Sequence, residues 1–297
     1  MTYLTEVKLN LKPIFHLFLK ISGIVFSVFA ILVTFISLED IGLTNIWHKI
    51  GIIISILVLS LIMSMILILF LFKKNRIWSN GKNKVFASYG DLIKYAFKVK
   101  EKNKRIIVIP VNDTFETIVD VGGEKVVNPL VSPNSLHGIW IEEFCKKYEI
   151  TVNELNSRIS ANLKLQNRKP VQIYSEDEKR RGNKEKYDLG TVAILNAGNT
   201  IFYLVAISEF DEKNNAQSNK IYIRKAVETL IEFYDENGQG FPLYMPLMGT
   251  GTSRAKLTHK QSLKLIKSGI FAFEEKINGQ INIIVFHKDR DKISIFD

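Results

Sequence analysis

A glycine- and hydroxyl-rich stretch, PLMGTGTSR at residues 246–254, has the composition of an anion-binding loop. Gly249 and Gly251 alternate with threonines directly after an apolar run. Glycine lets backbone N–H groups approach a ligand closely, and successive N–H groups can surround an anion. The stretch lacks the lysine of a P-loop and the third glycine of a dinucleotide fingerprint. It therefore predicts either an anion-binding loop of another kind or a plain glycine-rich turn.

Two further polar pairs follow segments that are predicted to be strands. Gly90-Asp91 ends the run KVFASYG, and Asn112-Asp113 ends RIIVIPV. Ligands of open α/β sheets collect at the carboxyl ends of the strands. We therefore expect these pairs to lie near the glycine-rich loop.

Other kinds of site are poorly supported by the residue types. The chain has a single cysteine, Cys145, and its five histidines lie far apart without an HExxH spacing, so neither a disulfide nor a metal site is expected. The net charge is +10, and residues 73–105 are strongly basic. Few aromatic residues are interleaved with these charges, which favours attraction to anionic lipid over binding of nucleic acid.

Two uncharged apolar runs precede the basic stretch. Residues 50–72 read IGIIISILVLSLIMSMILILFLF, and residues 21–38 form a second run that extends back to about residue 14. About 20 apolar residues suffice for a helix to cross a membrane. A signal peptide is the alternative for the first run, but it lacks a small-x-small cleavage site and a second run follows at once. The sequence thus predicts a transmembrane hairpin with helices at about 14–38 and 50–72, in a region 1–77.

The flanking charges predict the orientation of this hairpin. Lysines at positions 8, 12 and 20 and a basic cluster after residue 72 flank its two ends, whereas the link at residues 39–49 carries Glu39 and Asp40. By the positive-inside rule, both termini and the large domain face the cytoplasm.

The remainder, residues 78–297, alternates between strand and helix patterns. Strands are expected within 84–95, 105–112, 191–196, 200–208, 241–248 and 281–287, with helices at 134–147, 151–165, 216–234 and 258–268. Residues 169–186 read as a polar loop or a strand edge. The pattern predicts an α/β fold with three layers, α/β/α, around a mixed sheet.

Four motifs in order, YGDLIKY, IIVIPVND, VSPNSLHGIW and LYMPLMGTGTSR, resemble a divergent macro domain, a module that binds ADP-ribose. The resemblance implies that Asp91 reads adenine and that Asn112 lies near the distal ribose. It also implies that residues 131–138 form the family's glycine-rich loop before a helix, and that the loop 246–251 surrounds the diphosphate and ribose. The triple glycine of hydrolytic macro domains is reduced here to Gly138, which favours binding over hydrolysis, with no catalytic residue, metal or cofactor. The implied ligand-binding residues are Asp91, Leu92, Asn112, Asp113, Ser132, Asn134, Leu136, His137, Gly249, Thr250, Gly251, Thr252, Ser253 and Arg254.

A macro domain behind a transmembrane hairpin is similar to the membrane effectors of type II Thoeris antiphage systems. This resemblance implies a multi-pass protein of the bacterial inner membrane, with its soluble domain in the cytoplasm. A partner TIR-domain enzyme would make an ADP-ribose-derived signal, a histidine adduct, from NAD. Binding of the signal would drive homo-oligomerisation and disruption of the lipid membrane. The alternatives are a membrane-tethered ADP-ribosyl hydrolase and a basic reader of nucleic acid or poly-ADP-ribose.

Overall fold

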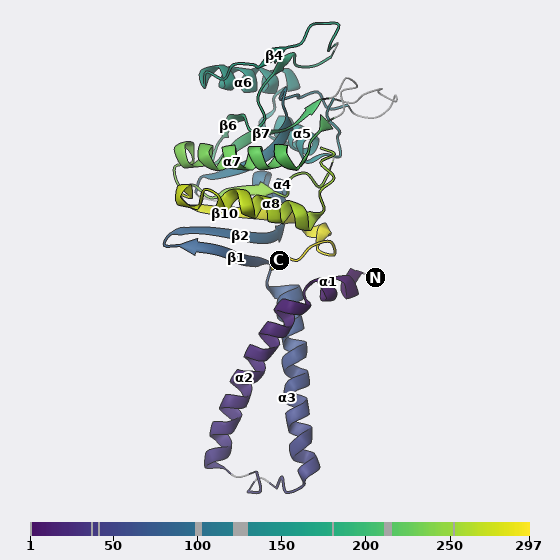
Figure 1. The fold of residues 1–297 in the computed structure, drawn as a ribbon, viewed down its shortest axis with the longest axis vertical. Helices are drawn as coiled ribbons and strands as arrows, with labels where there is room; N and C mark the ends of the chain where they lie inside the picture. The colour runs from purple at the N-terminus through teal and green to yellow at the C-terminus, as the bar shows by residue number, and fades with distance from the viewer. Residues whose placement is uncertain are drawn as a thin grey trace. The chain divides into compact units, whose positions relative to one another are not determined.

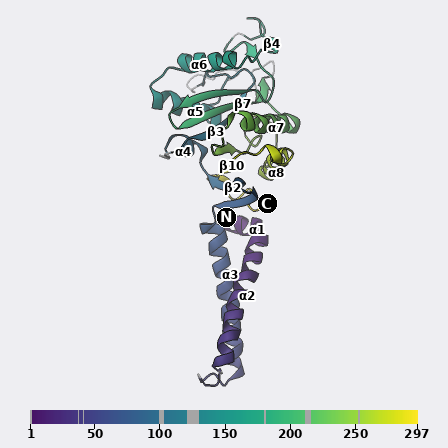
Figure 2. The same cartoon turned by 90° about the vertical axis from the view of Figure 1, so that its left-hand side faces the viewer.

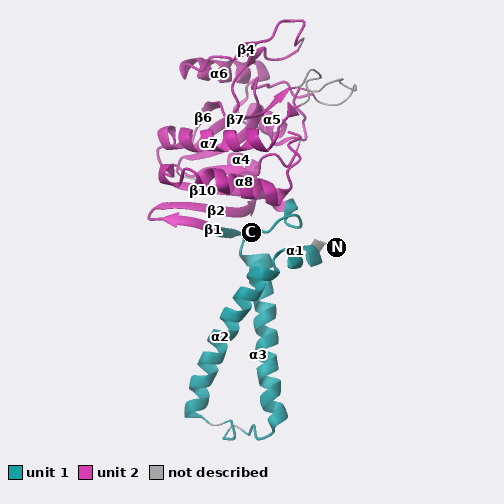
Figure 3. Cartoon of the chain, in the orientation of Figure 1, with its two compact units in different colours: residues 1–75, 288–297 teal, residues 76–287 magenta. Residues whose placement is uncertain are grey.

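The computed structural model describes residues 2–36, 38–40, 42–98, 103–120, 130–179, 181–210, 216–251 and 253–297. It divides into two compact units (Figure 3). The first holds residues 1–75 together with 288–297, and the second holds residues 76–287. The sequence-based boundary at residue 77 lies close to this division, but the assignment of residues 288–297 to the first unit was not predicted.

The first unit is helical (Figure 1). Its elements are α1 (Thr2–Leu9), α2 (Leu11–Phe35), α3 (Ile46–Ile66) and the π-helix η1 (Leu67–Leu71). Two helices, Leu11–Phe35 and Ile46–Leu71, are long and apolar enough to cross a membrane. Only 6% and 22% of their most apolar windows are buried, unlike the core helix of a soluble protein. Both helices begin three or four residues before the predicted positions.

Hydroxyl groups in these two helices bond to their own backbone. Ser22 Oγ donates to the carbonyl of Phe18 at 2.8 Å, and Ser27 Oγ donates to that of Gly23 at 2.8 Å. Thr34 and Ser64 bond back in the same way, at 2.9 and 2.8 Å. A hydroxyl in hydrocarbon needs such a partner because no water is present to replace it.

The second unit is built on one mixed sheet. Its strand order is β1-β2-β10-β9-β3-β7-β6, with β8 paired to β7. The strands from β2 through β10, β9 and β3 to β7 pair in parallel, whereas β6 and β8 pair antiparallel to β7. The strands are β1 (Lys74–Asn80), β2 (Asn83–Gly90), β3 (Arg105–Asn112), β6 (Val192–Ala197), β7 (Thr200–Phe210), β8 (Ala216–Gln217), β9 (Leu243–Pro246) and β10 (Gln280–Phe286), beside a separate pair, β4 (Gln172–Ile173) and β5 (Glu185–Lys186).

Helices cover both faces of the sheet, which gives the expected three layers (Figure 2). One face carries α4 (Leu92–Phe97), α5 (Leu136–Tyr148) and α6 (Val152–Leu165), and the other carries α7 (Lys220–Asn237) and α8 (His259–Phe271). Strand β3 is apolar and buried along nearly its whole length because both of its faces are covered. Its residues Ile107 and Ile109 pack with Trp140 of α5 in one core cluster.

Local capping explains two differences from the predicted elements. The strand within residues 84–95 ends at Gly90, at the predicted Gly90-Asp91 turn, but the short helix α4 that follows was not predicted; the Asp91 carboxylate starts it by accepting bonds from Ile93 N and Lys94 N. The helix expected from residue 216 starts at Lys220, since Asn219 caps it in the same way. Residues 216–217 instead pair with β7.

Candidate functional site

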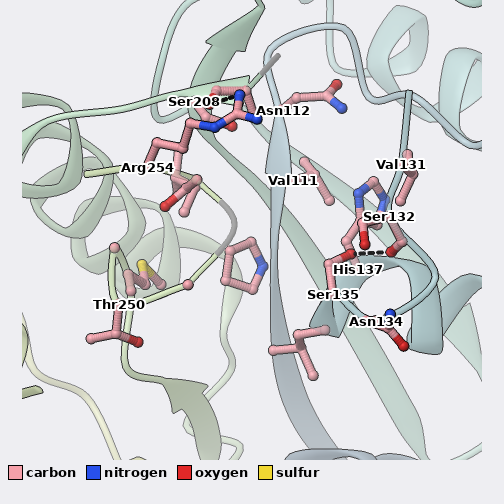
Figure 4. Close-up of a pocket in the computed structure, with 18 of the residues that line it drawn as sticks. Val111, Asn112, Val131, Ser132, Asn134, Ser135, His137, Ser208, Thr250 and Arg254 are labelled. Carbon is pink, nitrogen blue, oxygen red and sulfur yellow. Dashed lines mark hydrogen bonds between the residues drawn. The ribbon is translucent and has the colours of Figure 1, made fainter. Parts of the chain in front are cut away.

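A cavity of about 610 Å³ lies where the carboxyl ends of β3, β7 and β9 meet the amino terminus of α5. Parallel strands place these ends at one edge of the sheet, which is where ligands of α/β folds bind. In Figure 4, Thr250 and Arg254 approach from one side, His137 and Ser132 from the other, and Val111 lies between them. The lining residues are Pro110, Val111, Asn112, Leu130, Val131, Ser132, Asn134, Ser135, Leu136, His137, Ile207, Ser208, Ala216, Leu247, Met248, Gly249, Thr250, Gly251, Ser253 and Arg254.

The two glycines of the loop between β9 and α8 have different tasks. Gly249 has a φ of +81°, and a Cβ there would lie 2.9 Å from Leu257 Cδ1. Only glycine fits such a backbone without strain. Gly251 has no atom within 4 Å of an added Cβ and needs no left-handed φ. Gly249 thus shapes the loop, while Gly251 leaves space over the cavity.

A hydrogen bond from helix α8 holds the start of this loop. Ser262, which is fully buried, donates its hydroxyl to the carbonyl of Met248 at 2.6 Å. Leu257 N bonds to the carbonyl of Gly249 at 3.2 Å. The loop is therefore held at both ends, and its backbone is preorganised for a ligand.

The amino terminus of α5 forms the opposite wall. Ser135 caps this helix by accepting a bond from Gly138 N at 3.0 Å, and its hydroxyl donates to the carbonyl of Ser132 at 2.7 Å. A Cβ on Gly138 would lie 2.2 Å from that same carbonyl oxygen, so glycine is needed for the loop to lie against the helix. Leu136 and His137 in the first turn line the cavity, where the positive end of the helix dipole favours an anion.

The charges of the lining favour a negatively charged ligand. Among the described lining residues, Arg254 carries the one full charge expected at neutral pH, and none is a carboxylate. Burial lowers the pKa of His137 to about 3, so its imidazole is neutral at physiological pH. An anion in this cavity would meet a guanidinium and helix-terminal N–H groups without a like charge among these residues.

Asn112 is oriented by its own loop. The pairing of β3 with β7 shifts in register between Val111 and Asn112, as at a β-bulge that re-aims a side chain. Asn112 Oδ1 accepts bonds from Thr114 N, Thr114 Oγ1 and Glu116 N at 3.0–3.2 Å. With this oxygen occupied, the amide group remains as a donor for a ligand oxygen.

A buried polar network holds the loop that follows Asn112. Lys179 Nζ donates to Thr114 Oγ1 at 3.0 Å and to the carbonyl of Asn183 at 2.7 Å, and it lies 3.5 Å from Glu116 Oε2. Asn183 in turn donates to the carbonyls of Thr114 and Phe115. Lys179 and Glu116 are almost completely buried, so each needs the other as a partner. No sequence pattern indicated this network, because Thr114 and Glu116 lie more than 60 residues before Lys179 and Asn183.

Asp113 is not among the residues that line the cavity, and its nearest charged partner is Lys186. The Asp113 side chain is fully buried, and Lys186 Nζ lies 3.6 Å from Oδ2. Burial raises the pKa of the Asp113 carboxyl to about 6, although Lys186 and Lys179 oppose the rise and Glu209 adds to it. The folded protein therefore holds a proton on Asp113 at pH values where an unfolded chain has released it.

This proton gives a testable pH dependence. Because the folded pKa exceeds the unfolded value, ionisation of Asp113 removes stability as the pH rises from about 4 through 6. Asp113→Asn should therefore gain about 2 to 3 kcal/mol relative to the wild type between pH 4 and pH 8. Urea unfolding followed by the fluorescence of the buried Trp140 measures the difference. Parallel pH curves for the two proteins would contradict the assignment.

Most of the predicted site residues meet at the cavity. Asn112, the α5 loop residues and the residues of the glycine-rich loop line it, with Thr252 outside the described residues. Asp91 caps α4 and Leu92 is buried in the core, so neither is among the lining residues, and the role of Asp91 in reading adenine stays a prediction. Four further lining residues, Val131, Ser135, Leu247 and Met248, lie within the two predicted loops, whereas Pro110, Val111, Leu130, Ile207, Ser208 and Ala216 were not predicted to contact a ligand.

Comparison with known proteins gives the family. The family model described as "Thoeris protein ThsA, Macro domain" matches residues 87–286, about two thirds of the chain. The chain belongs to this family. A Thoeris protein ThsA of Bacillus amyloliquefaciens (strain Y2) is 23% identical over 274 residues, which cover 89% of this chain and 82% of that protein. The sequence-based resemblance to a Thoeris macro-domain protein is thereby confirmed.

Solved macrodomains are similar at a lower level. A macrodomain of Oceanobacillus iheyensis with ADP has 13% identity and a TM-score of 0.40, covering 75% of this chain and 93% of that one. A macrodomain of Trypanosoma brucei in complex with ADP-ribose has 8% identity and a TM-score of 0.41, covering 71% and 68%. The predicted class, an α/β macro fold preceded by two apolar helices, is confirmed by the family match and by the mixed sheet with helices on both faces in this chain.

Proposed function

We propose that this ThsA-family protein is a membrane-inserted antiphage effector whose macro domain binds an ADP-ribose-derived signal. The observation that carries the proposal is the cavity, whose described lining residues include Arg254 but no carboxylate. A diphosphate would lie between Arg254, the loop around Gly251 and the first turn of α5. A ribose hydroxyl oxygen would accept a hydrogen bond from the side-chain amide of Asn112. Binding would then bias the hairpin between two arrangements, which requires that the ligand prefer one of them.

The same lining favours binding over hydrolysis. Hydrolysis of an ADP-ribosyl bond needs a group that positions or deprotonates water. Among the described lining residues, the ionisable side chains are His137, which burial keeps neutral, and the cationic Arg254. The function proposed is therefore that of a receptor, supplied with its signal by a partner TIR-domain enzyme.

Calorimetric titration of the full-length protein in nanodiscs tests the proposal. ADP-ribose, its histidine adduct and NAD are compared, with ribose 5-phosphate as a control. Arg254→Gln should weaken binding of the diphosphate ligands about tenfold or more, because a charge-assisted hydrogen bond contributes about 1.5 to 3 kcal/mol. Turnover of an ADP-ribosylated substrate by the wild type would instead establish a hydrolase. Failure of all three ligands to bind would reject the proposal.

The orientation in the membrane is also part of the proposal. From the basic flanks we infer that both termini and the sensor domain face the cytoplasm, with the link at residues 39–49 outside. A Thr44→Cys variant, made in a Cys145→Ser background, should react with a membrane-impermeant maleimide on intact cells. Reaction only after lysis would reverse the orientation.

A further inference from the structure

The last ten residues, 288–297, bind the ends of the membrane hairpin. They follow β10 directly and belong to the first unit, with the helices. Ser294 Oγ donates to Asn10 Oδ1 at 2.6 Å, at the junction of α1 and α2, and both side chains are buried. Asn10 is itself fixed, because its amide donates to the carbonyl of Glu6 at 2.8 Å. The segment thus reaches the start of the first membrane helix.

The same segment also reaches the end of the second membrane helix. Arg290 donates to the carbonyl of Leu69 within η1, and its guanidinium lies 3.8 Å from Glu6 Oε2. The turn of η1 is widened, with Phe72 N bonded to the carbonyl of Leu67, five residues back. The last carbonyls of a helix need partners from outside it, and Arg290 supplies one. One side chain therefore connects α1 with the end of α3 and η1.

Apolar packing closes the same junction. Ile293 and Ile295 are completely buried, and Phe296 packs on a small cluster formed by Ile14, Ile68 and Leu69. Asn75 at the start of β1 donates to the carbonyl of Ile295 at 3.0 Å. Removal of such side chains from water stabilises the junction between the segment and the helices.

We propose that residues 288–297 are a clasp that holds α2 and α3 in a closed arrangement, and that its release activates the hairpin. The inference rests on the proposed function and adds the step between ligand and membrane. Strand β10 pairs with β9, the strand that leads into the glycine-rich loop of the cavity. The clasp begins immediately after β10. A ligand that shifts β9 and β10 would therefore also displace the clasp, because residue 288 is joined to the end of β10 by a single residue.

The alternative is a passive staple that stabilises the hairpin and never opens. A variant whose clasp contacts are weakened distinguishes the opening clasp from the passive staple, and it does so without any ligand. The full-length double variant Arg290→Gln with Ser294→Ala should release dye from phosphatidylglycerol/phosphatidylethanolamine vesicles at least about tenfold faster than the wild type. Lys292→Gln is the matched control, because Lys292 pairs with Asp289 within the segment and is half exposed. A folded double variant that leaks no faster than this control overturns the clasp.

A second experiment measures whether ligand binding exposes the clasp. Ser294→Cys in a Cys145→Ser background replaces a buried hydroxyl, so maleimide labelling should be slow in the free protein. Addition of ADP-ribose or its histidine adduct should accelerate labelling about tenfold or more, while an exposed reporter, Ser157→Cys on α6, stays unchanged. Unchanged labelling with ligand bound, as measured by calorimetry, overturns the clasp. If neither ligand binds, the proposed function fails, and the vesicle experiment still decides the clasp.

Discussion

Gly251→Glu is expected to abolish binding of ADP-ribose derivatives while the domain keeps its melting temperature. An added Cβ at Gly251 meets no atom within 4 Å, and the backbone there is not left-handed, so folding tolerates a side chain. A glutamate, however, places a negative charge and bulk over the cavity where the diphosphate is proposed to lie. Each lost charge-assisted hydrogen bond weakens binding about tenfold or more, and the like charge adds repulsion. Calorimetry beside thermal melts gives both values.

Two further variants distinguish the effect of charge on binding from the effects of side-chain bulk and backbone strain. Gly251→Gln has nearly the same shape without the charge, so it should weaken binding less than the glutamate does. Gly249→Ala forces a Cβ onto a left-handed backbone 2.9 Å from Leu257, and it should lower the melting temperature as well as the affinity. Wild-type affinity in a folded Gly251→Glu protein would show that the ligand binds elsewhere.

A protein made of residues 74–287 is expected to bind the ligand normally and to have no effect on cells. The sheet, its helices and the cavity lie within these residues, with β1 beginning at Lys74. The membrane helices, which are proposed to act on the lipid, are absent. Ligand titration and a growth assay during phage infection measure the two properties.

The end chosen for this fragment matters. A version comprising residues 73–297 keeps Ile293, Ile295 and Phe296 but removes the helices on which the clasp packs. Exposed apolar side chains promote association, so this longer fragment should aggregate more readily. Protection or toxicity from the 74–287 fragment would place the activity in the macro domain and favour an enzymatic function.

Strong local patterns made much of the fold predictable. Residues 105–112 form a continuous apolar run, which is typical of a strand covered on both faces, and β3 occupies these residues. The hairpin of β6 and β7 was marked by two β-rich runs around Gly198. Strand β1 was missed because its sequence, KNRIWSN, is polar and resembles a solvated juxtamembrane stretch.

Contacts between residues that are far apart in the sequence could not be predicted from local patterns. The segment containing Ile293 and Ile295 alternates like a short strand, but nothing local indicates that Ser294, between them, bonds to Asn10, 284 residues earlier. At the site, the sequence paired Asn112 with Asp113. Neighbouring residues of an extended chain point to opposite sides. Asn112 therefore lines the cavity, whereas the Asp113 side chain is buried beside Lys186.

The hydroxyl groups of the two apolar helices form hydrogen bonds to their own backbone, which limits the ion selectivity of any pore that several hairpins could form. The uncharged parts of the two helices carry no acid or base, and Ser22, Ser27, Thr34 and Ser64 already donate their protons to their own backbone. Over residues 21–35 and 50–71, a lumen formed by several such hairpins would present methyl groups and a few oxygen lone pairs, and Lys20 and Lys49 would supply the charges at its two ends. Conductance through it should therefore not favour potassium over chloride, and its effect on a cell would be collapse of the membrane potential rather than transport of one cation.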